Sequence, residues 1–415
     1  MMSRNSISVA AYNEFVENSQ GVYQRSSDAR DFNYSDGESS ERMLDDILEV
    51  AQDLSSESTE LQKHIVDWPT EYHLSSTRAN LLRALNLDGV TRVLELGCGC
   101  GSITRYLGEQ EGMRVDAIEG SPVRAALAKK RCRDLDNVEI CSANFNDIEL
   151  PKDEYDLVLF VGVTEYAGRF SSAETDEEAL HDLLAMGKAA CTENGVVLVA
   201  IENRLGMKYA LGANEDHYAV PFIGLDNYPN STGIKTYSKH DWLTYIRDAG
   251  FDNHSLLLPF PDYKIPHLVM HESCDDEQVG NALKEVTSRD YNRPFSLGEN
   301  EHRLWESLLQ AGTLPEHSNS FLWLLGSGEN ALQKMVKKTC TSFDIPQLTY
   351  DLPSEPKPVE VMREQDVKLV EHLNAQITQL QTHSTNLENK VQLMSNSIGW
   401  RILNGLRRLL RKNTL

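Results

Sequence analysis

The stretch that decides the fold is Val93-Leu94-Glu95-Leu96-Gly97-Cys98-Gly99-Cys100-Gly101, a short apolar run that leads into alternating glycines. The apolar run predicts a buried strand. The glycines allow a tight turn and a close approach of the backbone to a ligand. A helix is expected at 103–107, and its free N–H groups would face the same turn. This order of strand, turn and helix predicts a binding site at the carboxyl end of the strand.

Alternating strands and helices continue outward from this stretch. Their spacing predicts an α/β fold, with a Rossmann-like parallel sheet and helices on both faces. Helical patterns at 41–50 and 68–87 precede the sheet. The expected strands are 93–96, 114–118, 138–141, 155–161, 196–201, 251–258, 265–270 and 320–325. The expected helices between and after them are 103–107, 123–135, 177–190, 238–249 and 301–310.

The glycine pattern differs from that of dinucleotide-binding folds, which seat a pyrophosphate on Gly-x-Gly-x-x-Gly. Here the spacing is Gly-x-Gly-x-Gly, and an acid stands two residues before the first glycine. S-adenosylmethionine has no phosphate but carries a sulfonium cation, an ammonium and a carboxylate, so an acid beside the loop suits it. The sequence therefore predicts S-adenosylmethionine as cofactor, contacted by Glu95, Gly97, Cys98, Gly99 and Gly101.

Further cofactor contacts are expected where the next three strands end. Glu119, followed by Gly120, ends the second strand, and a carboxylate there can accept both ribose hydroxyls. Asn144 and Phe145 follow the third strand, where they would bracket an adenine, and the fourth strand ends in Val161 and Gly162. The alternative is a doubly wound fold in which the acids serve only as caps.

Methyl transfer to a hydroxyl needs a base, because a hydroxyl is a poor nucleophile. The first candidate is His217, in the long polar loop 202–236, with Asp216 beside it to orient the imidazole. The rival is Glu165, after the fourth strand. Two alternatives stay open: His217 could be a structural histidine bonded to backbone, and Glu165 could contact only the cofactor.

Four more residues are candidates for binding the acceptor or the cofactor carboxylate: His73, Arg78, Glu202 and Asn203, together with Asp216. His73 and Arg78 could instead form a surface pair on their helix. Glu202, Asp216 and His217 offer ligand atoms for a divalent metal. Their spacing matches no known ligand pattern, so no metal site is predicted.

Several narrower motifs resemble a group of bacterial methyltransferases linked to O-antigen and other surface polysaccharides, including the methyltransferase half of the enzymes that cap O-chains. The similar segments are 72–83 (Tyr72-His73-Leu74-Ser75-Ser76-Thr77-Arg78-Ala79-Asn80-Leu81-Leu82-Arg83), 93–107, 119–121, 162–166, 200–209, Glu215-Asp216-His217, 259–266 and 319–322. The resemblance covers about 68–325, and no kinase signature follows it. It implies O-methylation of a sugar hydroxyl on a glycan or lipid-linked saccharide. A methyltransferase for a small metabolite or protein, or a non-catalytic scaffold, remain alternatives.

The C-terminal part has a different organisation. A proline-rich linker is expected at 341–361. Apolar residues at heptad spacing over 362–396 predict a coiled coil. The pattern over 397–415 predicts a basic amphipathic helix. The coiled coil could join copies of the chain or a glycosyltransferase partner, because such tails resemble those of polysaccharide-cluster glycosyltransferases. The alternative is one helix packed on the domain. The basic helix suits an anionic membrane surface, or else it is a frayed tail or docks on a partner.

The amino-acid composition limits the partners and the cellular location that can be expected. The net charge of −23 argues against nucleic acid as a partner, because the phosphate backbone binds proteins mainly through Lys and Arg side chains. Seven cysteines without a CxxC pair favour reduced thiols. With no signal peptide or apolar span, the expected location is cytoplasmic, either free or peripheral on the inner face of the membrane. Residues 1–40 are expected to be a mobile acidic segment, and 41–340 the catalytic domain.

Overall fold

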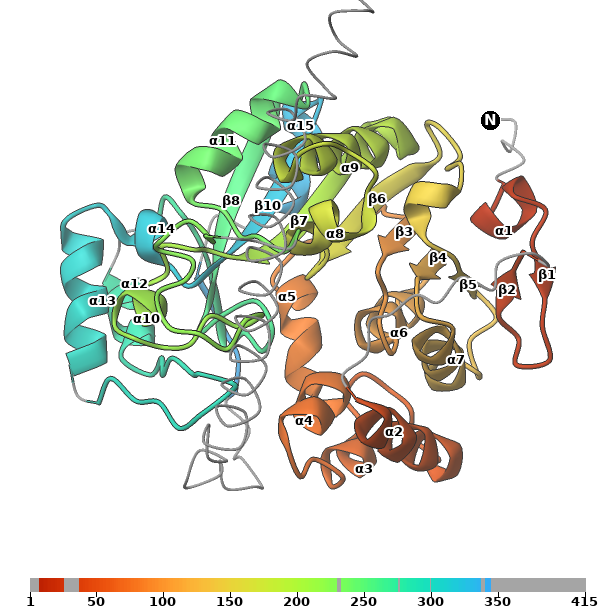
Figure 1. Cartoon of the computed structure of the whole chain (residues 1–415), viewed down its shortest axis with the longest axis horizontal. Coiled ribbons are helices and arrows are strands. Elements are labelled where there is room, and N and C mark those ends of the chain that lie inside the picture. Colours follow the sequence, from red (N-terminus) through yellow and green to blue (C-terminus); the bar gives the residue numbers. More distant parts are fainter. Residues whose placement is uncertain are drawn as a thin grey trace, which may run out of the picture. The chain divides into compact units, whose positions relative to one another are not determined.

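The computed structural model describes residues 7–25, 37–229, 233–274, 277–298, 300–336 and 340–344 (Figure 1). They belong to the first of two compact units, residues 1–354. The predicted coiled coil at 362–396 and basic helix at 397–415 lie outside the described residues, as does the linker beyond residue 344. Among the helices described, none is long and apolar enough to cross a membrane.

The described strands form one eleven-stranded sheet, in the order β1-β2-β5-β4-β3-β6-β7-β10-β8-β9-β11. All the strands expected after residue 90 are present, with ends shifted by a few residues. The bounds are β1 Val16–Glu17, β2 Tyr23–Gln24, β3 Arg92–Leu96, β4 Arg114–Glu119, β5 Val138–Ser142, β6 Tyr155–Val161, β7 Cys191–Glu202, β8 Asn253–Phe260, β9 Leu268–His271, β10 Ser320–Gly326 and β11 Cys340–Ser342.

The strand order reverses at β3, in the centre of the sheet. Val93 pairs in parallel with Val115 of β4 on one side and with Leu157 of β6 on the other. Strands β3 to β7 are all parallel, so their carboxyl ends meet at one edge, and ligands of such sheets bind at the reversal point. Strand β10 departs from the expected parallel arrangement, because it runs antiparallel between β7 and β8.

Helices cover both faces of the sheet, as predicted. One face packs against α1 (Val9–Tyr12), α9 (Asp176–Ala190), α11 (Lys239–Asp248), α12 (Glu277–Leu283), α13 (Asn300–Gln310) and α14 (Leu314–His317). The other packs against α5 (Asn80–Arg83), α6 (Ser102–Gly108), α7 (Pro122–Arg131) and α15 (Glu329–Met335). Local signals fix these helices. In α7, for example, the Ser121 side chain caps the first turn, Pro122 opens the helix, and basic residues end it.

A separate helical layer precedes the sheet. It consists of α2 (Glu38–Val50), α3 (Thr59–Gln62) and α4 (Trp68–Leu74), the orange group in Figure 1, and it shares a small apolar core with Leu127 of α7. The single helix expected over 68–87 is wrong. The chain becomes extended at Ser75, whose side chain caps a following 3₁₀ turn, η1 (Ser76–Ala79), before α5 begins.

The prediction of a mobile segment over 1–40 is also wrong for residues 7–25. The side chains of Val9 and Val22 are buried, and Tyr23 of β2 pairs with Cys141 of β5. The sequence pattern missed this because only a few apolar residues, widely spaced among polar ones, make the contact. Residues 1–6 and 26–36 lie outside the described part of the chain.

The long loop 202–236 is shaped by short elements rather than by regular structure. It contains α10 (Met207–Ala210), and it contacts η3 (Thr164–Tyr166), where the Lys235 N–H donates to the Glu165 backbone oxygen at 2.9 Å. Its Gly233 lies beside Gly168 of α8 (Ala167–Phe170), while η2 (Phe145–Asp147) follows β5. Four non-glycine residues of the loop adopt positive φ angles, namely Ala219, Phe222, Asn227 and Tyr228. Such conformations are costly and need support from the surrounding structure.

A buried carboxylate joins the N-terminal segment to the sheet. One oxygen of Asp116 accepts hydrogen bonds from Tyr155 Oη at 2.6 Å, from Arg92 Nη2 at 3.2 Å and from the Val9 backbone N–H at 3.3 Å. Burial raises the pKa of Asp116 despite these partners. We expect Tyr155→Phe to lower the free energy of unfolding by about 1–3 kcal/mol, because a buried acceptor loses its shortest partner.

Urea denaturation followed by circular dichroism measures this loss. Tyr12→Phe is the matched control, because the Tyr12 side chain is exposed. A loss for Tyr155→Phe no larger than that of the control would contradict the importance of this hydrogen bond.

Candidate active site

A cavity of about 350 Å³ opens where β3, β4 and β6 end. This size is typical of a small-molecule site. Nine of the eleven residues predicted to bind the cofactor line it: Glu95, Gly97, Cys98, Gly99, Glu119, Gly120, Phe145, Val161 and Gly162. His73, Arg78, Glu165, Asp216 and His217 line it as well. Sequence positions far apart therefore meet at one place, as the strand ends predicted.

Each glycine of the loop has its own reason to lack a side chain. A Cβ at Gly97 would lie 2.5 Å from Val163 Cγ2, and one at Gly101 would lie 2.8 Å from the backbone of Ala128. Gly101 therefore brings α6 against α7 and does not line the cavity, contrary to its predicted role as a cofactor contact. A Cβ at Gly99 would meet no atom within 4 Å. Gly99 borders the cavity, so its backbone is open to a ligand.

The carboxylate of Glu119 fixes the glycine loop. One oxygen accepts the Gly99 N–H at 2.8 Å and the other accepts the Ser121 N–H, also at 2.8 Å. A carboxylate has about four acceptor positions, so ribose hydroxyls can still be bound. Glu119 thus positions the loop as well as lining the cavity, and the first of these roles was not indicated by its place in the sequence.

Two buried charged groups of opposite sign face the cavity beside the loop. Burial raises the pKa of Glu95 to about 7, although Thr104 Oγ1 donates to its carboxylate at 2.6 Å. Arg78 Nη1 donates to the backbone oxygen of Lys264 at 2.6 Å, and Arg78 Nε is buried without a hydrogen-bond partner among the described residues. An acid and a guanidinium suit the ammonium and the carboxylate of one amino acid. Arg78 is not part of a surface pair.

The prediction for Asn144 needs correction. Its side chain caps η2 by accepting the Asn146 N–H at 3.0 Å, so it is engaged locally and does not line the cavity. Phe145 and Asn146 line it instead. The strand end was identified correctly, but a cap residue cannot be told from a ligand contact by position alone.

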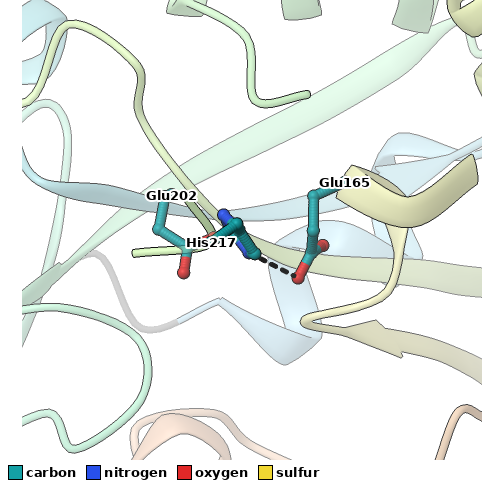
Figure 2. A group of neighbouring side chains, drawn as sticks. All are labelled: Glu165, Glu202 and His217. Atoms are coloured by element: carbon teal, nitrogen blue, oxygen red, sulfur yellow. Dashed lines mark ion pairs between the residues drawn. The ribbon is translucent and has the colours of Figure 1, made fainter. Parts of the chain in front are cut away.

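Glu165 and His217 lie together, as Figure 2 shows. His217 Nδ1 is 2.8 Å from Glu215 Oε1, and His217 Nε2 is 3.6 Å from Glu165 Oε1. The His217 imidazole is therefore hydrogen-bonded to the Glu215 carboxylate and within ion-pair distance of Glu165, rather than bonded to backbone. The residue that orients the imidazole is Glu215 rather than the predicted Asp216. The reason is electrostatic, because the ammonium groups of Lys208 and Lys264 hold the carboxylate of Asp216.

The surrounding carboxylates control the protonation of this pair. Burial opposes a charged imidazole, but Glu202, Glu165 and Glu215 outweigh it and raise the pKa of His217 well above its usual value. Burial also raises the pKa of Glu165. One oxygen of Glu165, Oε2, is buried without a hydrogen-bond partner in the described part of the chain. With His217 holding a proton, Glu165 is the group that can accept another.

Two buried lysines hold the acids of the loop in place, and the sequence predictions missed both. Lys264 Nζ contacts Glu202 and lies 2.6 Å from Asp216 Oδ2, while Lys208 Nζ lies 3.2 Å from Asp216 and 3.5 Å from Asp262. Burial opposes ionisation of Asp216, but Lys208 and Lys264 lower its pKa overall. The motifs at 200–209 and 259–266, singled out by resemblance, were the available signal.

Two of the predicted acceptor residues do not reach the cavity. Asn203 is buried and donates to the backbone oxygens of Glu316 and Ser318 at 2.9 and 2.8 Å, so it joins β7 to β10. Glu202 is buried behind His217, with Oε1 on Lys264 and Oε2 without a hydrogen-bond partner among the described residues. Among the described residues, the groups close enough for one metal ion are Glu165, Glu202 and His217, with Glu165 in the place considered for Asp216.

Aromatic rings form a wall of the cavity that the sequence did not reveal. Trp68 and Tyr72 of α4, together with Tyr166 and Phe170 on the side of α8, line it. Trp68 stacks on Tyr291 with ring centroids 3.8 Å apart. Apolar faces with a few polar groups are the usual composition of a small-molecule site.

Comparison with known proteins identifies the domain. Residues 93–183 match a family model described as a methyltransferase domain. The chain is 31% identical over 84 residues to the cyclopropane-fatty-acyl-phospholipid synthase of Escherichia coli K12. That match spans 20% of this chain and 21% of the synthase.

Similar solved structures are methyltransferases as well. A phosphoethanolamine N-methyltransferase 2 of Haemonchus contortus in complex with S-adenosyl-L-methionine is 17% identical, with a TM-score of 0.36 and coverage of 61% of this chain and 52% of that one. A SAM-dependent methyltransferase of Archaeoglobus fulgidus is 14% identical, with a TM-score of 0.36 and coverage of 61% and 96%. Residues 93–183 therefore match a methyltransferase domain, the reversal of strand order at β3 is typical of a ligand site at the glycine loop, and the cofactor is S-adenosylmethionine.

The pKa of Glu95 leads to a prediction for cofactor binding. A carboxyl group with a pKa of about 7 is charged at pH 8 and mostly neutral at pH 6. If the bound cofactor needs the carboxylate, its affinity falls about tenfold from pH 8 to pH 6. Titration calorimetry at both pH values measures this change.

Glu95→Gln is expected to weaken binding and to remove this part of the pH dependence. The ammonium group of the cofactor titrates equally with both proteins, so the difference between them isolates Glu95. An identical pH profile in the two proteins would contradict a direct role of the carboxylate.

Proposed function

We propose that this protein transfers a methyl group from S-adenosylmethionine to a sugar hydroxyl of a bacterial surface glycan of the O-antigen type. The observation that carries the proposal of methyl transfer is that the glycine loop after β3 and the Glu165–His217 pair border the same cavity. A cofactor site and a proton acceptor are thus side by side. The choice of a glycan rests on the resemblance of the motifs at 200–209, 215–217 and 259–266.

The residues of the cavity have distinct proposed roles. Gly99 and Glu119 would hold the nucleoside, while Glu95 and Arg78 would hold the ammonium and carboxylate of the methionine part. When bound, S-adenosylmethionine supplies a methyl group that bonds to the acceptor oxygen as the carbon–sulfur bond breaks, so the hydroxyl proton must pass to a base. Glu165 is the proposed base, because its Oε2 is buried without a partner among the described residues. His217 would hold the Glu165 carboxylate in position.

A sugar acceptor fits the composition of the remaining wall. Trp68 and Tyr72 offer apolar ring faces, and Asp216 and Lys264 offer acceptors and a donor for hydroxyl groups. Positioning of the acceptor beside the methyl group is expected to supply much of the rate, since holding two reactants aligned removes several kcal/mol from a barrier, roughly 7–11 in the best cases.

The match to the curated synthase spans about a fifth of that protein, so the activity of the whole chain is a proposal. We further propose that residues 362–396 join the domain to another copy or to a glycosyltransferase, and that 397–415 bring it to the inner membrane face. The basic residues and heptad pattern of the sequence support this proposal.

Deletion of the gene in its native bacterium tests the acceptor class. We expect mass spectrometry of the surface glycan to show loss of one methyl ether per modified unit, restored by a plasmid copy. An unchanged glycan in the deletion strain would refute the glycan assignment, even if the purified protein binds S-adenosylmethionine.

The unmethylated glycan from that strain then serves as the acceptor for the purified enzyme. We expect Glu165→Gln to lower kcat by a factor of about 10²–10⁴, the usual contribution of a general base. Cofactor affinity, measured by calorimetry, should change by less than about threefold, roughly 0.7 kcal/mol. Glu193→Gln, at an exposed position of β7, is the control. A kcat for Glu165→Gln equal to that of the control would remove Glu165 from catalysis.

A further inference from the structure

Glu165, Glu202 and His217 come from three separate segments, namely η3, the end of β7 and the loop that follows α10. One ligand atom of each lies within 4.8 Å of the others. Figure 2 shows the imidazole between the two carboxylates. We propose that these three side chains bind one divalent cation. The inference goes beyond the proposed methyl transfer, because metal binding can be measured without an acceptor.

Both carboxylates present an unused oxygen. Oε2 of Glu165 and Oε2 of Glu202 are buried and lack a hydrogen-bond partner among the described residues. The two residues are only 3% and 1% exposed. A buried carboxylate oxygen without a partner is costly. Two of them beside one imidazole nitrogen indicate a missing positive group.

The orientation of His217 matches that of a metal ligand. Its Nδ1 is 2.8 Å from Glu215 Oε1, so Nδ1 can donate to that carboxylate, and a metal ion would replace the proton on Nε2, the ring nitrogen nearer Glu165. Metal-binding histidines typically use one ring nitrogen for the ion and the other for a carboxylate. Glu215 is itself fixed by the N–H groups of His217 and Tyr218, both at 2.9 Å. The distance of 3.6 Å from His217 Nε2 to Glu165 is long for a direct hydrogen bond.

The net negative charge around Glu165, Glu202 and His217 favours binding of a divalent cation. Five buried carboxylates, on Glu165, Glu202, Glu215, Asp216 and Asp262, surround His217 and the ammonium groups of Lys208 and Lys264. An imidazole that binds a metal ion is neutral, so in the metal-bound site the carboxylates would exceed the ammonium groups by three. A divalent cation would reduce this excess to one. Lys264 contacts Oε1 of Glu202, so Oε2 of the same carboxylate stays available.

The set of donor atoms indicates which ion would bind. Two carboxylates and one imidazole suit Mn²⁺ or a similar divalent ion better than a soft metal, which prefers thiolates. Ligand atoms lie about 2.1 Å from such ions, so ligands sharing one ion are roughly 3–4 Å apart. Small rotations of the carboxylates would close the site. Because Glu165 and His217 line the cavity, the ion would have an open side toward an acceptor, where it could hold a hydroxyl oxygen and favour its ionisation, while the Glu165 oxygen that does not bind the ion accepts the proton.

The test uses the full-length protein, freed of metal by a chelator and titrated with MnCl₂. Electron paramagnetic resonance follows free Mn²⁺, and we expect one bound ion per chain that Mg²⁺ or Zn²⁺ displaces. Glu165→Gln and Glu202→Gln should each weaken Mn²⁺ binding at least tenfold. Glu215→Gln should weaken it about 10- to 100-fold, as usual for the partner of a ligating histidine. Glu193→Gln should bind as the wild type does.

Calorimetry with S-adenosylmethionine shows whether each variant is still folded. A protein that binds S-adenosylmethionine but does not bind Mn²⁺ at about 1 mM would overturn this inference. A dissociation constant of that size corresponds to a binding free energy of only about −4 kcal/mol. The proposed methyl transfer would be unaffected by this result. Equal Mn²⁺ affinity in the wild type, Glu165→Gln and Glu202→Gln would overturn it as well. The inference would also be overturned if an alkylammonium salt stabilised the protein against unfolding and Mn²⁺ did not. That result would assign the cluster to binding of a cationic acceptor.

Discussion

Lys264 is the residue on which the walls of the cavity depend. Its ammonium group contacts Glu202 at the end of β7 and Asp216 in the following loop. Its backbone oxygen accepts a hydrogen bond from the guanidinium group of Arg78. Three segments that are distant in the sequence are thereby fixed to one position. A buried ammonium is stable only with such partners, so the acids and the lysine require one another. The shape of the acceptor side follows from this charge balance more than from apolar packing.

The cofactor side has a different origin, because local backbone geometry determines it. Gly97 and Gly101 are needed where a side chain would strike Val163 or Ala128, and the carboxylate of Glu119 receives the N–H of Gly99. These constraints act over short stretches at the ends of adjacent strands. That locality explains why the central strands, the helices on both faces and most of the residues that line the cavity at these strand ends could be predicted from the sequence. The buried apolar strands and the glycine spacing were sufficient.

The acceptor side could be predicted only in part. His217 and Glu165 were identified as residues but not with their partners, because the orientation of an imidazole in a loop depends on which neighbour a distant lysine attracts. Asp216 turns to Lys208 and Lys264, and Glu215 takes the place beside His217. Asn203 looked like a ligand contact but bonds to the backbone before β10, a strand more than a hundred residues away. No periodicity in a single sequence reports such pairings.

The N-terminal hairpin has a consequence that concerns neither the cofactor nor the acceptor. β2 joins the sheet beside β5, so the outermost strand on that side is the two-residue β1, and on the other side it is the three-residue β11. A long bare edge offers its free N–H and C=O groups to any extended chain, whereas short edge strands offer few. The segment that covers β5 therefore protects the protein against edge-to-edge aggregation. Short edge strands of this kind therefore favour solubility, in addition to the stability that the core provides.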